Sequence, residues 1–483
     1  MSNDILKLSA TQLVAAYRNH TLSPVEVVRA VLDRIAGLDP VFNAFCVLDE
    51  EGALRSARES ELRWQRNAPA GLVDGLPTTV KDLILARGWP TRRGSRTIDP
   101  AQAWSEDGPP VARMREQGAV LLGKTTTPEF GWKGVTDSPL TGITRNPWNP
   151  ELTPGGSSGG AAVCAALGMG PLHVATDGGG SIRIPAAFCG IFGFKPTWGL
   201  VPVHPHSPAG TLWHQGALTR TVADAALMLE VISRPDARDW SSVPHETDWR
   251  GTLDDGIRGW RIAYSRTLGY ANVDPPVAAA VERALRTFED MGASVESVDL
   301  KLADPIDIMQ PLWSLALALA LAPLDPDRRA LVDPPMLALA EPGFSMAALE
   351  YRRLEREREA FGRRMNALHA TYDLLVTPQM PITAFAAGHE VPPDGSRRRW
   401  WEWSPFTYPF NLTQQPAASV PCGFTDAGLP VALQLVGPKF GDARVLRAAR
   451  AYESVAPFRM PAIPPRSAAS PPASAGRILV GEN

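Results

Sequence analysis

Short and long hydrophobic periods alternate along the chain. Apolar runs typical of buried strands occur at residues 119–122, 259–265, 294–300, 374–377 and 431–436. Stretches with helical periodicity lie between them, such as residues 276–291 and 443–455. Strands that alternate with helices indicate an α/β fold.

Two helix start signals stand close to the N-terminus. Ser9 is followed three residues later by Gln12, and Ser23 by Glu26, with Pro24 at the first helical position. In this spacing the serine side chain accepts a hydrogen bond from an otherwise unpaired N–H of the first turn, and the Gln or Glu side chain accepts one from the serine N–H. We therefore expect the chain to begin with helices.

One apolar run, residues 311–324, interrupts this pattern. It is too short to span a bilayer, so we expect a buried helix or a pocket wall, with a lipid-contacting surface as the alternative. Residues 233–254 have a linker-like composition, and residues 461–483 form a Pro/Ala/Ser-rich tail that is predicted to be disordered. No clear domain boundary divides the rest, which predicts one domain over residues 1–460.

Composition and charge narrow the class of partner. The chain of 483 residues carries 48 basic and 51 acidic side chains, a net charge of −3, which gives no reason to expect nucleic acid or an anionic membrane. The four cysteines show no C-x-x-C spacing, so neither a zinc site nor a disulfide framework is indicated. The N-terminus lacks the pattern of a signal peptide. These features predict a cytoplasmic protein that acts on a small molecule.

Two short motifs match known patterns, but their surroundings argue against both. Residues 118–125 (GAVLLGKT) have the spacing of a phosphate-binding loop, yet Ala-Val-Leu-Leu is typical of a buried strand. Residues 155–159 (GGSSG) have the spacing of the nucleophile elbow of α/β-hydrolases, which must follow a strand. The preceding residues 146–154 contain three prolines, which cannot donate to a strand ladder. Both motifs stay as minor alternatives.

A third stretch, residues 176–185 (TDGGGSIRIP), favours catalysis. Consecutive glycines let the backbone turn its N–H groups inward, so Gly178, Gly179, Gly180 and Ser181 can form a nest of donors beside the Ser181 hydroxyl. Such donors would stabilise the negative charge of an attacked carbonyl oxygen. The flanking residues are apolar, which argues against a flexible linker. The pattern predicts a serine nucleophile with an oxyanion hole.

A serine nucleophile needs a base, and no histidine lies in a motif that would place it. His173 lies in an apolar, strand-like run and is expected in the core, while His204 and His206 lack a third metal ligand at a suitable spacing. Lys81 follows a strand-like run that begins at Pro77, so it can lie buried at a strand end. Burial lowers the pKa of a lysine, and the resulting neutral amine makes Lys81 the candidate base.

Three separated segments together resemble the amidase signature family. Lys81 in VKD, Ser157 in PGGSSGG and Ser181 in TDGGGSIRIPAAFCGIFGFKPT match the family's Ser–cis-Ser–Lys triad in the right order. Segments such as GLPTTVKD, RNPWNPE and QPAASVPCGFTDAGLPVALQLVG extend the likeness from residue 8 to residue 458. The resemblance implies an α/β fold with a large mixed β-sheet between helical layers and a signature core over residues 73–232.

The resemblance also implies roles for these residues. Ser181 looks like the nucleophile, Ser157 like the bridging serine that relays a proton, and Lys81 like the base. Asp177 and Arg183 are similar to the family's structural ion pair, although an ordinary core pair would look the same.

Ser158 is expected to support its loop by hydrogen bonding. The family likeness implies a small-molecule amide as substrate, with neither a metal nor an organic cofactor, and it allows a homodimer.

Residues 400–410 (WWEWSPFTYPF) bear on the substrate class. In the family's glutaminase subunits of tRNA amidotransferases, an acidic residue two positions before the matching Phe-Thr holds the amino group of glutamine, and this sequence has Ser404 there. The expected pocket residues are Trp400, Trp401, Trp403, Ser404, Phe406 and Tyr408. Unless these rings are ordinary core, they favour a hydrophobic aliphatic or aryl amide, hydrolysed to a carboxylic acid and ammonia or an amine.

Two alternatives stand beside this amidase activity. The chain could be the glutaminase subunit of a tRNA-dependent amidotransferase, or a non-catalytic homologue that binds a partner. No member of the triad is missing from the sequence, which favours an enzyme.

Overall fold

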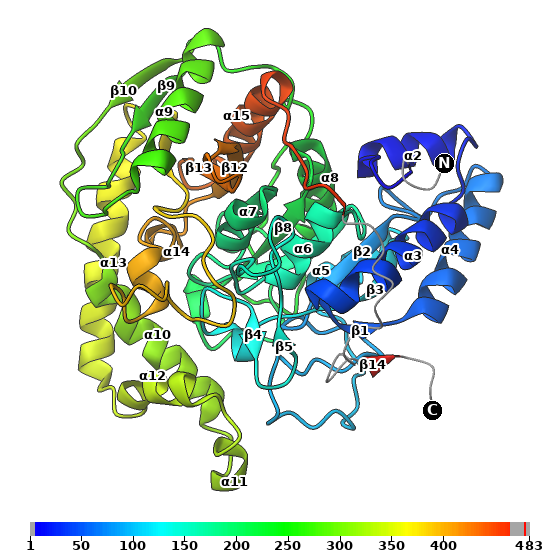
Figure 1. The fold of residues 1–483 in the computed structure, drawn as a ribbon, viewed down its shortest axis with the longest axis horizontal. Helices are drawn as coiled ribbons and strands as arrows, with labels where there is room; N and C mark the ends of the chain where they lie inside the picture. Colours follow the sequence, from blue (N-terminus) through cyan, green and yellow to red (C-terminus); the bar gives the residue numbers. More distant parts are fainter. Residues whose placement is uncertain (1–4, 464–477, 480–483) are drawn as a thin grey trace.

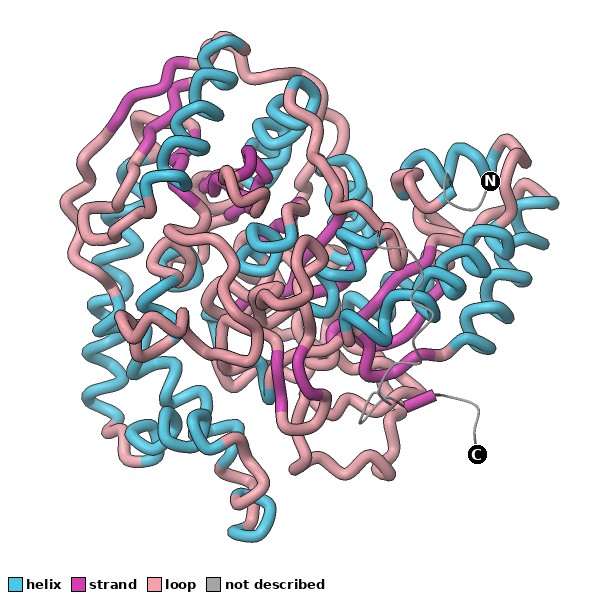
Figure 2. Tube along the Cα trace, viewed as in Figure 1, coloured by secondary structure: helices cyan, strands magenta, loops and turns pink. Residues whose placement is uncertain are grey.

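A computed structural model of the chain describes residues 5–463 and 478–479. Helices and strands alternate along it, and the helices enclose one large sheet (Figures 1 and 2). The helices are α2 (Ala10–Arg18), α3 (Pro24–Phe42), α4 (Glu50–Gln65), α5 (Pro109–Glu116), α6 (Gly159–Leu167), α7 (Arg183–Cys189), α8 (Val222–Ile232), α9 (Pro275–Asp290), α10 (Ile306–Leu321), α11 (Pro326–Arg329), α12 (Pro334–Phe344), α13 (Ala348–Leu368), α14 (Pro409–Leu412) and α15 (Asp442–Val455). Short 3-10 turns are η1 (Glu129–Gly131), η2 (Gly210–Leu212) and η3 (Trp400–Trp403).

The main sheet has twelve strands. Their order is β10 (Ser294–Ser297), β9 (Arg261–Tyr264), β11 (Leu374–Pro378), β13 (Pro430–Val436), β12 (Ala417–Phe424), β7 (Phe192–Lys195), β8 (His214–Thr219), β6 (Leu172–Asp177), β2 (Pro77–Lys81), β3 (Val120–Thr125), β1 (Phe45–Leu48) and β14 (Ile478–Leu479). A separate hairpin joins β4 (Asp137–Ser138) to β5 (Gly142–Ile143). Parallel pairing of β2 with β3 and β6 continues into antiparallel pairing from β6 through β8, β7 and β12 to β13, so the sheet is mixed as predicted.

The two faces of the sheet bury separate hydrophobic cores. On β3, Leu121 packs into one core, which includes residues of α5, α8, α9 and α15. Its neighbours Val120 and Leu122 pack into the other core with α3 and α6. Because successive side chains of a strand point to opposite faces, the strand serves both cores. The expected arrangement of a sheet between helical layers is confirmed.

The predicted elements are largely where the hydrophobic pattern put them. Each of the five strand-like runs contains a strand, β3, β9, β10, β11 or β13, and the two helical stretches correspond to α9 and α15. Both capping boxes are present, at Ser9 before α2 and at Ser23 before α3. Residues 233–254 contain neither helix nor strand.

Part of the C-terminal tail lies within the described residues. There, Ile478–Leu479 pairs in parallel with β1. A backbone whose N–H and C=O groups meet an open strand edge can pair there whatever its composition. The other tail residues from 464 onward lie outside the described part of the chain.

The apolar run 311–324 forms most of α10, which packs against α12 in a third hydrophobic cluster (Figure 1). Within the described residues, no helix is both long and apolar enough to cross a membrane.

Candidate active site

Lys81 is the last residue of β2, and the strand carries it into the interior. β3 and β6 pair with β2 on either side, which buries the strand along its whole length. Lys81 is completely inaccessible to solvent. Its Nζ lies 2.7 Å from Ser157 Oγ, 2.8 Å from Ser158 Oγ and 2.9 Å from Thr176 Oγ1. The amine is therefore surrounded by three hydroxyl groups.

Burial lowers the pKa of Lys81 well below its ordinary value, and the negative charge of Asp177 opposes this shift only in part. A neutral amine keeps a lone pair, so one of the three hydroxyls can donate a hydrogen bond to Nζ. Ser157 is the closest of them. The arrangement can therefore take a proton from Ser157.

Ser157 lies in the loop that leads into α6, and a glycine lets this loop approach its neighbour. The peptide bond between Gly156 and Ser157 is cis, as the family resemblance implied. A Cβ atom on Gly156 would stand 2.5 Å from the backbone carbonyl of Val135, closer than packed atoms allow. A larger residue would therefore displace the loop that brings Ser157 to Lys81.

Ser181 stands between β6 and α7, and its loop is joined to that of Ser157. The Ser158 N–H donates to the Ser181 carbonyl oxygen over 3.1 Å. Ser181 keeps 7% of its surface exposed, whereas Ser157 keeps 1% and Lys81 none. Of these three side chains, Ser181 is therefore the one that a substrate can reach most readily.

The predicted nest of backbone donors is narrower than expected. The Gly180 N–H donates to Asp177 Oδ1 over 2.8 Å, because the carboxylate turns back beneath its own loop. Among the described residues, the N–H groups of Gly178, Gly179 and Ser181 have no hydrogen-bond partner. The candidate oxyanion hole thus has three donors, and Gly180 is corrected to a structural position, where its φ of +132° favours glycine.

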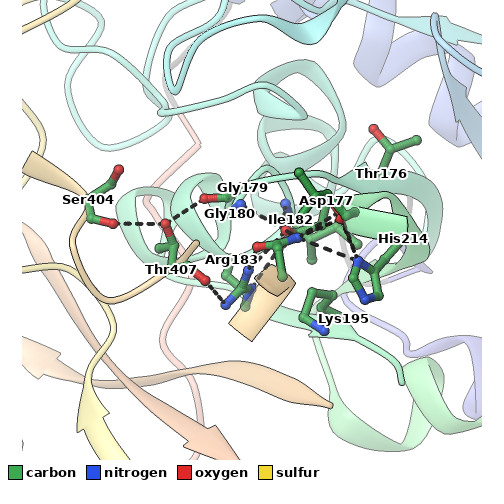
Figure 3. A network of polar contacts seen from close by, with 12 residues as sticks. Thr176, Asp177, Gly179, Gly180, Ile182, Arg183, Lys195, His214, Ser404 and Thr407 are labelled. Atoms are coloured by element: carbon green, nitrogen blue, oxygen red, sulfur yellow. Dashed lines mark hydrogen bonds and ion pairs between the residues drawn. The ribbon is translucent and has the colours of Figure 1, made fainter. Parts of the chain in front are cut away.

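Asp177 and Arg183 form a buried ion pair under the glycine loop (Figure 3). The Arg183 Nε and Nη2 atoms each donate to the Asp177 carboxylate over 3.0 Å, and both side chains are inaccessible. Burial alone would raise the pKa of Asp177, but the charge and hydrogen bonds of Arg183 hold it below its ordinary range. The carboxylate also accepts the Ile182 N–H over 3.1 Å, so the pair fixes the loop on both sides of Ser181.

Three residues that the sequence did not reveal complete this support. Thr407 Oγ1 donates to the Gly179 carbonyl over 2.6 Å and contacts the Ser404 carbonyl at 2.9 Å (Figure 3). The Asn411 amide donates to Asp177 over 2.8 Å. Thr176 supplies the third hydroxyl at Lys81. Thr176 could have been inferred from its place beside Asp177 at the end of a strand, whereas the others are more than 200 residues away from the loop in sequence.

The aromatic segment after residue 399 is mainly core. Trp403 stacks on Phe188 at 5.9 Å between ring centroids, and Phe406 belongs to a separate hydrophobic cluster. The Tyr408 hydroxyl donates to Asp304. These three rings have core contacts, which explain an aromatic run as well as a pocket wall does, so their place in a substrate pocket stays a prediction. Trp401 and Ser404 are buried too.

Trp400 is buried in the same hydrophobic cluster as Trp403, and its ring also packs against the glycine loop, since a Cβ on Gly179 would meet it at 2.8 Å.

A cavity lies close to the glycine loop, although Gly178, Gly179, Gly180 and Ser181 are not among the residues that line it. A Cβ on Gly178 would lie 3.0 Å from the Trp313 ring and 3.2 Å from that of Trp213, and both rings line the cavity. Trp313, Ala316, Leu317 and Ala320 of α10 line this cavity, so the run 311–324 contributes to a cavity wall, one of the two main roles expected of it. Other lining residues are Leu83, Ile84, Arg93, Phe130, Val203, His204, Pro205, His206, Ser207, Pro208, Ala209 and Gln215.

Neither of the two short motifs has the surroundings that its known pattern requires. The phosphate-loop lookalike ends in β3, where Lys124 is buried and lies 3.1 Å from Asp82. No strand directly precedes residues 155–159. His173 is a core residue of β6 that contacts Thr79 Oγ1 at 2.8 Å, and burial lowers its pKa to about 3. Within the described residues, no group of three His, Cys, Asp or Glu side chains is placed to hold a metal ion.

Comparison with known proteins agrees with this geometry. The model of the amidase family matches residues 26–446, most of the chain. This protein belongs to the amidase signature family. As a member of that family it is an amidohydrolase by descent.

Two curated relatives of this amidase are about equally similar to it. An acylamidase of Rhodococcus erythropolis is 35% identical over 459 residues, covering 93% of this chain and 96% of its own. A glutamyl-tRNA(Gln) amidotransferase subunit of Myxococcus xanthus is 36% identical over 477 residues, covering 92% of this chain and 96% of its own. Among solved structures, a bacterial aryl acylamidase of the amidase signature family superposes with a TM-score of 0.87 at 30% identity, covering 93% of this chain and 96% of that chain.

Proposed function

We propose that this amidase hydrolyses a hydrophobic aliphatic or aryl amide through an acyl-enzyme on Ser181. The observation that carries the proposal is the fully buried Lys81 amine, 2.7 Å from Ser157 Oγ and with a lowered pKa. Lys81 accepts a proton from Ser157 as Ser157 accepts one from Ser181. The Ser181 oxygen then attacks the amide carbon.

The attacked carbonyl oxygen gains negative charge, which the free N–H groups of Gly178, Gly179 and Ser181 stabilise. When the tetrahedral intermediate collapses, the carbon–nitrogen bond breaks and the proton returns through Ser157 to the leaving nitrogen. A water molecule then attacks the acyl carbon with the same relay as base. The carboxylic acid leaves and Ser181 regains its proton.

The cavity supports an apolar substrate. Tryptophan, phenylalanine and aliphatic side chains make up much of its wall, and none of the residues that line it is an Asp or a Glu. Burial of apolar surface favours binding by roughly 25 cal/mol per Å². The ammonium group of a free amino acid amide would instead lose its hydration without meeting a carboxylate, which lowers kcat/KM for such a substrate by about a thousandfold or more. Glutamine is therefore expected to be a poor substrate.

The test compares kcat/KM for a neutral aryl amide with that for glutamine on the purified chain, without tRNA or other subunits. We expect a large preference for the aryl amide. Ser181→Ala should abolish its hydrolysis, and Ser454→Ala, an exposed serine on α15, should leave it unchanged. A preference for glutamine would support the amidotransferase alternative, and a folded chain that hydrolyses no amide would support a non-catalytic role.

A further inference from the structure

Arg93 lines the cavity beside the glycine loop and also a second, outer cavity. Phe130, Pro205 and Ala320 are shared in the same way, so Arg93 lies where the two cavities meet. The side chain is half-buried in the loop between β2 and α5. It is the only Lys or Arg among the residues that line the inner cavity.

The backbone fixes Arg93 at this junction. The Phe130 N–H donates to the Arg93 carbonyl oxygen over 2.7 Å. Both residues adopt left-handed backbone conformations, with φ of 55° at Arg93 and 50° at Phe130. Bulky side chains rarely adopt such angles, and residues held in them cluster at ligand sites. This backbone hydrogen bond therefore holds the cation of Arg93 and the aromatic ring of Phe130 together where the two cavities meet.

The guanidinium of Arg93 has no protein partner within the described chain, and its half-buried side chain leaves it open to solvent. It makes no hydrogen bond or ion pair there, while Asp82, the acidic residue that acts on it, is 3.1 Å from Lys124 and accepts the Gly94 N–H. Arg183 shows the contrast, because its donors are all engaged by neighbouring groups. A guanidinium stays charged in proteins, so a half-buried one without a protein partner is paired by water or by an anionic ligand.

The residues that line the inner cavity beside Arg93 lie close to the candidate catalytic residues, although no catalytic residue lines the cavity itself. Leu83 lines the cavity, and a Cβ on Gly131 would lie 2.8 Å from Leu83 and 3.2 Å from Ser157 Oγ. At another part of the wall, Trp213 and Trp313 lie against Gly178. A ligand whose amide reaches the glycine loop therefore extends past apolar side chains toward Arg93.

We propose that the substrate is an amphipathic amide whose apolar body carries a carboxylate, and that Arg93 binds this carboxylate. The inference rests on the proposed amidase function and narrows its substrate class. The planar guanidinium presents two parallel N–H donors that match the two oxygens of a carboxylate. The outer cavity has two acidic residues, Asp99 and Glu106, beside Arg93 and Arg328, whereas no acidic residue lines the inner cavity.

The experiment uses amides that carry either a free carboxylate or its methyl ester, which differ in charge but little in shape. One pair has the carboxylate on the acyl side of the amide and a second pair has it on the amine side. For at least one pair, we expect the wild type to favour the acid over the ester by about ten- to a hundredfold in kcat/KM. Arg93→Met should reduce this ratio to near one, and Arg93→Lys should retain part of it.

Arg96→Met is the matched control, since Arg96 lies on the same loop but is exposed. It should leave the ratio unchanged. Equal turnover of acid and ester by the wild type, or an equal loss of both in Arg93→Met, would overturn the assignment of Arg93.

Measurements of binding distinguish a failure of the Arg93 inference from a failure of the proposed amidase function. Isothermal titration of the same compounds into Ser181→Ala measures affinity without turnover, and the acids should bind more tightly than the esters only while Arg93 is present. If the amide bond is hydrolysed but neither kcat/KM nor binding favours the acids over the methyl esters, the inference is refuted and the amidase function stands. Tighter binding of the acids in a protein that hydrolyses neither would support Arg93 and refute the amidase function.

Discussion

Replacing Arg183 with methionine removes the cation beneath the glycine loop while keeping a side chain of similar length. The guanidinium makes five hydrogen bonds, two to Asp177 and one each to Thr407, Gln434 and Asn411. Arg183 and Asp177 are both inaccessible, so water cannot replace the lost partner. The variant therefore leaves a buried carboxylate uncompensated.

Breaking a buried ion pair on one side costs about 3–5 kcal/mol of the free energy of unfolding. A chain of 483 residues has an unfolding entropy of about 1 kcal/mol per kelvin, so Tm should fall by about 3–5 °C. Amide hydrolysis should fall as well, because Asp177 holds the N–H groups of Gly180 and Ile182 on both sides of Ser181.

The pKa of Asp177 determines how the loss of Tm in Arg183→Met should change with pH. In the wild type, the lowered pKa of Asp177 stabilises the fold above the unfolded value of about 4, and this stability is lost as the pH falls through the folded pKa. In Arg183→Met, burial raises the pKa of Asp177 instead. Protonation then relieves the buried charge, so the difference in Tm between variant and wild type should shrink from pH 7 to pH 5.

Differential scanning fluorimetry at both pH values measures these shifts, with Arg353→Met as control, since Arg353 forms its ion pairs on the exposed surface of α13. The double variant Asp177→Asn/Arg183→Met should be less destabilised than the sum of the two single variants. If Arg183→Met melts with the control, or its Tm difference grows as the pH falls, the reasoning about this ion pair is wrong.

Two further predictions concern the surroundings of Lys81. Because burial lowers the pKa of Lys81, the rate of hydrolysis should rise with pH as the ammonium loses its proton. Lys81→Arg should be inactive across the same pH profile, since an arginine stays protonated. Substantial activity in that variant would mean that the base lies elsewhere. Thr176→Val removes one hydroxyl at Nζ and should lower kcat by about two- to thirteenfold, from the roughly 0.5–1.5 kcal/mol of a neutral hydrogen bond. An unchanged kcat would show that this contact does not position the amine.

The sequence predicted the strands and the residues of the site better than it predicted the shape of the pocket. Strand β2 and the burial of Lys81 could be predicted from local patterns, because a short strand-like run by itself indicates a buried strand. The meeting of Lys81 with Ser157 depends on residues 76 positions apart, and here the family likeness supplied what periodicity could not.

The pocket was harder to predict because burial in the core and burial around a substrate select the same residues. Trp403 and Trp313 are both apolar and buried, yet the first packs on Phe188 and the second lines the cavity. Likewise, the glycine pattern indicated four free donors, and only the returning Asp177 carboxylate shows that Gly180 is engaged. Arg93 carried no sequence signal, since its significance lies in the partners it lacks.

The most direct test of the central claim is the site of covalent labelling by a serine-reactive fluorophosphonate. Peptide mass spectrometry of the labelled protein should find one modification, on Ser181, and Lys81→Met should slow its formation because the relay has lost its base. Labelling should be absent in Ser181→Ala and unaffected in Ser454→Ala. Modification of Ser157 in the wild type, or undiminished labelling of Ser181→Ala, would contradict the assignment of Ser181 as the nucleophile.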